Sequence, residues 1–96
     1  MRNLLKYNFC TCLLLLTMSF CGSAKEVDAE ALFKQGNAAY AKNQFKEAAL
    51  AYQEVLNAGY QSAEVYFNLG NANYKLSEIS QAILNYEKAL KISPGD

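Results

Sequence analysis

The sequence predicts an all-α protein of two helical hairpins, and three observations carry that prediction. Gly36 and Gly70 lie 34 residues apart (70 − 36), and at this offset eleven residues of one copy meet identical residues in the other, a period typical of helical repeats. In each copy apolar residues recur at i, i+3, i+4 and i+7, the spacing of a helix face. Small residues recur where paired helices approach closely. The first-copy members are Ala29, Glu30, Phe33, Gly36, Asn37, Ala38, Tyr40, Ala48, Leu50, Tyr52 and Leu56.

The N-terminal segment, residues 1–24, has the composition of a secretory signal peptide. Arg2 and Lys6 supply a positive start, residues 9–20 supply an apolar middle, and small residues ending at Ala24 offer a cleavage site. The apolar middle is shorter than the roughly 20 residues that a helix needs to span a bilayer. We therefore expect an exported protein of the periplasm or cell envelope, cleaved at the end of this segment.

Two alternatives for this segment stay open. Cys21 resembles the acceptor of a bacterial lipoprotein, in which a lipidated cysteine would anchor the chain to a membrane. Against that, Met18 and Phe20 occupy places where the lipoprotein pattern usually has Leu and a small residue. The other alternative is an uncleaved anchor. Cys10 and Cys12 are interpreted as apolar filler of the leader.

The first hairpin follows a short polar linker, residues 25–28. Asp28 is placed to cap the first helix, because its carboxylate can accept a hydrogen bond from a free backbone N–H and oppose the helix dipole. We expect that helix over residues 29–42. Asn43 tolerates positive φ and is expected in the turn that follows. The second helix is expected over residues 45–57.

The second hairpin repeats this plan. Ser62 is placed as the cap of a third helix over residues 63–76, and the chain then turns into a fourth helix over residues 79–92. Pro94 ends that helix, because proline cannot continue it. The sequence thus predicts four antiparallel helices joined by short turns.

These residues resemble the tetratricopeptide repeat (TPR) family, with one copy at 29–62 and one at 63–96. The resemblance rests on the run from Ala63 to Leu76 and its counterpart one period earlier, followed by Ala82, Tyr86, Ala89 and Pro94. It implies a fragment of a right-handed α-solenoid. It also implies that the first helices of successive repeats line a concave groove, whose ligands are extended peptides or partner helices.

The TPR pattern places Glu30, Ala41 and Glu64 on the concave face, together with nine residues that we assign to the peptide-binding groove. Asparagine carries both a hydrogen-bond donor and an acceptor, so the three asparagines are candidates to hold the backbone of an extended peptide. The aromatic residues would supply apolar anchors. Alternatively, the asparagines bridge neighbouring helices and the tyrosines pack between repeats. The nine are Phe33, Lys34, Asn37, Tyr40, Phe67, Asn68, Asn71, Tyr74 and Lys75.

One TPR subclass grips a C-terminal carboxylate with lysines and asparagines. Phe33 stands where that clamp has Lys, so we do not expect this chain to belong to that subclass.

Composition removes most catalytic chemistry. All three cysteines precede residue 22 and the sequence has no His, so the repeats offer no Cys or His metal ligand, Cys nucleophile or imidazole base. Without the leader the chain has seven Lys against nine Asp plus Glu, a net charge of 7 − 9 = −2, and no basic patch. We expect no enzyme activity, no cofactor and no nucleic-acid partner.

A closer resemblance is to the TPR protein of the Bacteroides aerotolerance (Bat) group. It is carried by the runs from Ala31 to Tyr40, from Tyr60 to Leu76 and from Ala82 to Leu90. Members of the group are exported or membrane-associated and work in a complex with von Willebrand-type partners. The resemblance implies an exported scaffold that binds a protein or peptide partner in an envelope complex.

The last helix suggests a different function. Stacked repeats bury their faces on neighbours, so about three units or a capping helix are normally required. Nothing later in this sequence covers Ile83, Leu84, Leu90 and Ile92. The alternative is therefore a structural repeat pair that forms a homo-oligomer through its fourth helix, or a truncated fragment of a longer envelope protein, with no groove ligand.

Overall fold

The computed structural model describes residues 27–95. The predicted signal peptide, its cleavage after Ala24 and lipidation of Cys21 lie outside the described residues. Within that range the chain forms four α-helices and no strand, which confirms the predicted all-α class. Two helices end one residue earlier than expected, because Lys42 and Leu76 are C-cap residues. The helices are α2 (Ala29–Ala41), α3 (Phe45–Asn57), α4 (Ala63–Lys75) and α5 (Ile79–Ile92).

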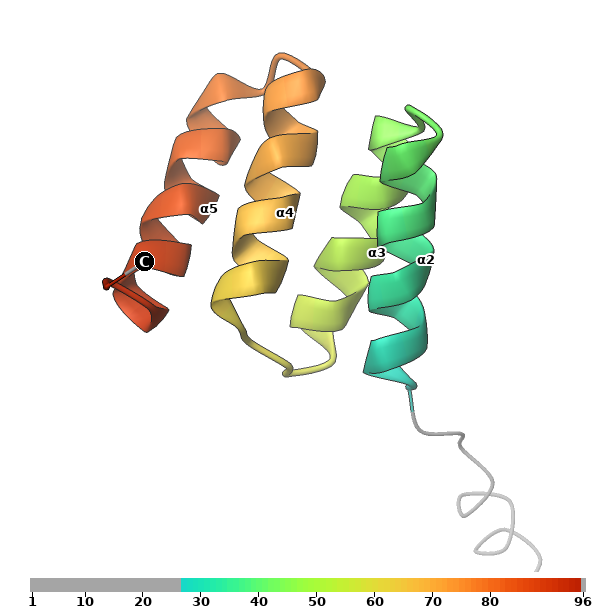
Figure 1. The fold of residues 1–96 in the computed structure, drawn as a ribbon, viewed down its shortest axis with the longest axis horizontal. Helices are drawn as coiled ribbons and strands as arrows, with labels where there is room; N and C mark the ends of the chain where they lie inside the picture. Colours follow the sequence, from blue (N-terminus) through green and yellow to red (C-terminus); the bar gives the residue numbers. More distant parts are fainter. Residues whose placement is uncertain (1–26, 96) are drawn as a thin grey trace, which may run out of the picture.

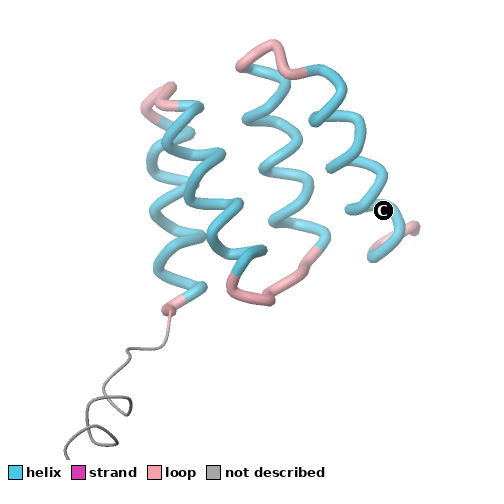
Figure 2. Tube along the Cα trace, turned by 180° about the vertical axis from the view of Figure 1, so that it is seen from behind, coloured by secondary structure: helices cyan, strands magenta, loops and turns pink. Residues whose placement is uncertain are grey.

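The helices stand in sequence order, each antiparallel to the one before it (Figure 1). Consecutive helices pack on one another, so α3 lies between α2 and α4, and α5 packs on α4. Seen from behind, the two turns inside the hairpins lie at one end of the molecule and the link from α3 to α4 lies at the other (Figure 2). Within residues 27–95, no helix combines the length and apolar character needed to cross a membrane.

Local side-chain chemistry sets where the helices begin and turn. Asp28 Oδ1 accepts a hydrogen bond from the Ala31 backbone N–H at 3.1 Å, and Ser62 Oγ accepts one from the Val65 N–H at 3.1 Å. Both predicted caps are therefore confirmed. Asn43 has the expected positive φ of 61°. Each cap satisfies a backbone donor that the first turn of a helix leaves unpaired.

The core lies between α2, α3 and α4, around Tyr52, whose side chain is 1% exposed. The Tyr52 ring lies directly over Gly36, where an added Cβ would come within 2.6 Å of its Cε1 atom. Tyr86 covers Gly70 in the same way, at 2.7 Å. The repeated glycines are thus required by the tyrosine of their own hairpin, because any larger residue would collide with the ring.

Candidate functional site

The site is built from one small unit that occurs twice. In the first copy the Tyr52 hydroxyl donates a hydrogen bond to Asn37 Oδ1 at 2.5 Å. In the second the Tyr86 hydroxyl donates to Asn71 Oδ1 at 2.7 Å. Each asparagine follows the glycine that the tyrosine covers, so ring packing and the hydrogen bond fix the same pair of helices. A phenylalanine also contacts each tyrosine ring, with centroids 5.8 Å apart for Phe33 and Tyr52 and 5.7 Å apart for Phe67 and Tyr86.

The two units are joined across the repeat boundary by asparagine side chains. Asn68 Nδ2 on α4 donates a second hydrogen bond to Asn37 Oδ1, at 3.2 Å. Asn37 therefore bridges α2, α3 and α4, as the alternative interpretation of the asparagines expects. These hydrogen bonds use only some of the donor and acceptor atoms of the three asparagine amides. In the described structure no hydrogen bond reaches Asn37 Nδ2, Asn68 Oδ1 or Asn71 Nδ2.

These side chains surround a hollow of about 230 Å³ between α2 and α4. Four of the nine predicted groove residues line it, namely Asn37, Tyr40, Asn68 and Asn71. The other two lining residues are Ala41, which the TPR pattern also places on the concave face, and Tyr52, which we did not expect in the groove. The sequence signal for Tyr52 is its identity with Tyr86 at the 34-residue offset, which by itself indicates only the repeat.

The five other predicted groove residues lie outside the hollow. Phe33 packs against the core, and Phe67 lies beside Tyr86.

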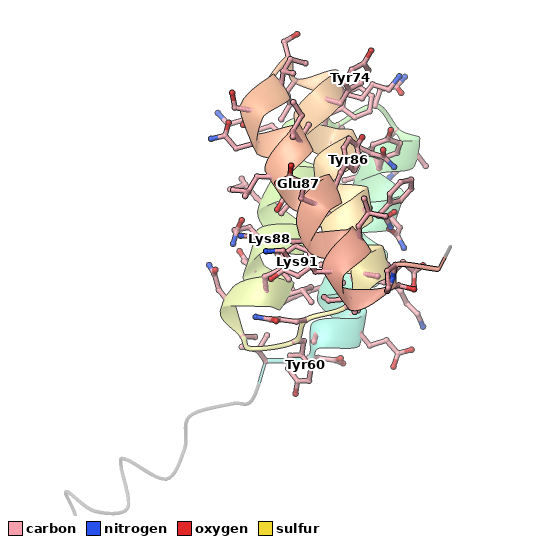
Figure 3. All side chains as sticks on the ribbon, turned by 90° about the vertical axis from the view of Figure 1, so that its left-hand side faces the viewer. Tyr60, Tyr74, Tyr86, Glu87, Lys88 and Lys91 are labelled. Carbon is pink, nitrogen blue, oxygen red and sulfur yellow. The ribbon has the colours of Figure 1, made fainter. Side chains whose placement is uncertain are left out.

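Lys34 Nζ lies 3.4 Å from Glu30 Oε1, in an exposed ion pair. Lys75 Nζ lies 5.9 Å from the centre of the Phe45 ring. Tyr74 is exposed on the last turn of α4, at the opposite end of the molecule from Tyr60 (Figure 3).

The electrostatics of the hollow are those of neutral amides and phenols. Burial raises the pKa of both the Tyr52 and Tyr86 phenols above the ordinary value of 10.0, and nearby tyrosines add to the shift. Both hydroxyls therefore stay protonated at neutral pH and keep donating to their asparagines. Within residues 27–95, no group of three or more acidic, Cys or His side chains is arranged to hold a metal ion. The hollow offers hydrogen bonds and aromatic surface.

Comparison with known families agrees with this geometry. A model of the tetratricopeptide repeat family matches residues 27–96. The chain belongs to the TPR family. TPR repeats generally mediate protein–protein interaction and are typically non-catalytic scaffolds. A comparison with curated proteins gave no match.

Proposed function

We propose that this TPR protein is an exported interaction module that binds an extended peptide of a partner protein in the hollow between α2 and α4. The observation that carries the proposal is a set of asparagine amide atoms that make no hydrogen bond within the described structure. Two Nδ2 donors, on Asn37 and Asn71, and one acceptor, Asn68 Oδ1, surround one hollow. A peptide backbone presents the complementary alternation of C=O and N–H groups.

The internal hydrogen bonds favour this binding, because they hold the amides before a ligand arrives. Ordering a free asparagine side chain would otherwise oppose binding, and a preorganised site avoids much of that loss. Tyr40 adds an aromatic wall to the hollow, and its ring lies edge-on to Phe45 with centroids 5.1 Å apart. The wall is thus held in position by α3 as well as by its own helix.

The cellular setting of the proposal rests on sequence alone. The signal-like composition of residues 1–24 and the resemblance to the Bat group favour an envelope complex related to aerotolerance. In that setting the module would hold one protein of the complex and leave the chemistry to others.

The proposal can be tested by filling the hollow without removing any of its hydrogen bonds. Ala41 lines the hollow with an exposed methyl group, so Ala41→Arg would occupy the space. Ala31 on the same helix is also exposed and lies outside the hollow, which makes Ala31→Arg the matched control. Tagged full-length chains would be used to capture partners from envelope extract, after circular dichroism has shown equal helicity.

We expect a partner that is captured by the parent chain and by Ala31→Arg but is lost with Ala41→Arg and with Asn71→Ala. Equal capture by all four chains would reject the hollow as the binding site. A synthetic peptide from the captured partner should then bind the parent chain and Ala31→Arg more tightly than Ala41→Arg and Asn71→Ala.

A further inference from the structure

The second repeat ends in an apolar surface that no described residue covers. We call it the end face and define it by Phe67 of α4 with Ile79, Ile83, Tyr86 and Leu90 of α5. Phe67, Ile83 and Leu90 are 53%, 53% and 55% exposed, whereas aliphatic and aromatic side chains of this size are usually buried. Figure 3 shows Tyr86 at the edge of α5, apart from the row of Glu87, Lys88 and Lys91.

The end face is hollowed. A depression of about 620 Å³ lies between α4 and α5, with Phe67, Tyr86, Ala89 and Leu90 in its lining. Most of its exposed lining is carbon, and Glu64 stands at its rim. The shape and chemistry suit the apolar side chains of a partner helix rather than a polar small molecule.

The same face exists one repeat earlier, and there its occupant is visible. Each end-face residue has a counterpart 34 positions before it, and none of these counterparts is exposed. Four of them belong to or pack against the core that α4 completes with Val65, Leu69 and Ala72. The counterparts are Phe33, Phe45, Ala49, Tyr52 and Leu56.

The occupant also makes one directional contact. Asn68 of α4 donates to Asn37 Oδ1, which already accepts the Tyr52 hydroxyl. Asn71 Oδ1 is the counterpart acceptor and receives the Tyr86 hydroxyl, but no described amide donates to it. Since a carbonyl oxygen has two lone pairs, Asn71 can accept the same second bond.

We propose that the end face binds an amphipathic helix of another polypeptide, one that carries the side-chain pattern of α4. That pattern is a branched apolar residue, an amide three positions later, a Leu four positions later and an Ala seven positions later, as in Val65, Asn68, Leu69 and Ala72. The apolar residues fill the depression and the amide donates to Asn71 Oδ1. This site adjoins the peptide hollow at Asn71, takes a different ligand on a different face, and goes beyond the proposed function.

A second copy of this chain fits the end face less well. The helix that a copy could offer in the orientation of α4 is α2, at the opposite end of the stack. Where α4 and its C-cap have Val65, Leu69 and Leu76, α2 and its C-cap have Ala31, Gln35 and Lys42, all exposed. Burying a glutamine and a lysine against an apolar face is unfavourable because both lose their hydration without gaining partners. A dimer in which two end faces met would bring two depressions together. Neither depression would be filled, so the side chains that line them would lack contacts.

The probe for this proposal is a synthetic peptide of residues 61–77, which contains α4 with its Ser62 cap. We expect the fluorescently labelled peptide to bind the full chain saturably at one site. Leu90→Asp should weaken that binding roughly tenfold or more, because a charge would replace a buried apolar contact. Leu50→Asp is the matched control, since Leu50 is 58% exposed on α3 and lies outside the end face. A peptide with Leu69→Asp should not bind.

Three outcomes would overturn the proposal. One is a well-folded chain that does not bind the peptide at all. Another is binding that Leu90→Asp leaves unchanged. The third is a dimer in sedimentation experiments that Leu90→Asp dissociates and the peptide does not, which would assign the face to a second copy. None of these results depends on Ala41, so failure here and failure of the peptide hollow are distinguishable.

Discussion

The two repeats contain the same Phe–Gly–Asn–Tyr unit in different surroundings. Tyr52 is covered by α4 and is 1% exposed, whereas no described helix covers Tyr86, which is partly exposed. Yet the ring contact, the close approach to glycine and the hydrogen bond to asparagine are nearly the same in both copies. The residues of a repeat therefore determine geometry inside its own hairpin, and the neighbouring repeat determines how much that geometry stabilises the fold.

The largest test of this comparison is to remove each tyrosine ring. Tyr52→Ala should cost about 3–5 kcal/mol of the free energy of unfolding, the range for deleting a large buried ring. Tyr86→Ala should cost about half of that or less, because less of its surface is removed from water. Urea denaturation followed by circular dichroism measures both. If Tyr52→Ala does not fold, Tyr52→Leu replaces it, and equal losses at the two positions would contradict the comparison.

The glycines give the next largest difference. Gly36→Ala drives a methyl group against a ring enclosed by three helices, and such overpacking costs about 1–3 kcal/mol. At Gly70 the Tyr86 ring can swing toward solvent, so the gain of about 1 kcal/mol in helix propensity from Gly to Ala should offset most of the strain. Thermal unfolding of the two variants measures this. A larger loss at Gly70 would show that the exposed repeat is the more rigid one.

The asparagines should differ less. Asn37 Oδ1 accepts two hydrogen bonds and Asn71 Oδ1 accepts one, and a typical bond contributes about 0.5–1.5 kcal/mol net. Asn37→Ala should therefore destabilise the chain about twice as much as Asn71→Ala. A double-mutant cycle with Asn68→Ala isolates the bond between repeats. We expect coupling of Asn68 to Asn37 and none to Asn71, and the reverse result would reject the assigned bonds.

The smallest effect is a dependence on alkaline pH. The pKa values of Tyr52 and Tyr86 are raised in the folded chain, so as pH rises past about 10 the unfolded chain loses these protons first. The two protonated phenols therefore contribute their full share of the free energy of unfolding below about pH 10. This share is lost as pH rises toward the pKa values of the folded chain. Tyr52→Phe should flatten this decline more than Tyr86→Phe does. Urea midpoints measured between about pH 9 and pH 11 test it.

The sequence predicted most of the fold because its signals were local. Caps, turns and helix faces depend on residues a few positions apart, and Asp28, Ser62 and Asn43 all behave as expected. Contacts between helices were harder to infer. Asn73 is buried on α4 and accepts a hydrogen bond from Asn85 at 2.8 Å, a contact that depends on how α4 and α5 pack.

The candidate site shows the same division. The repeat pattern identified the asparagines, because they recur at fixed places on the first helix of each copy. It could not show that Tyr52 forms part of the hollow, since that depends on the depth of the α3 packing. Nor could it show that Lys75 lies over Phe45 rather than in the hollow, because a long side chain chooses among neighbours that only the fold supplies.

The turns inside the two hairpins have a consequence for mutational tolerance. Asn43 and its counterpart Ser77 both have a left-handed backbone, with φ of 61° and 63°. That conformation costs most residues about 1–2 kcal/mol, and asparagine adopts it more readily than serine. The hairpin with less buried surface therefore also carries the more strained turn. We therefore expect the second copy to tolerate fewer destabilising substitutions than the first. Ser77→Gly should stabilise it, because glycine adopts positive φ without strain.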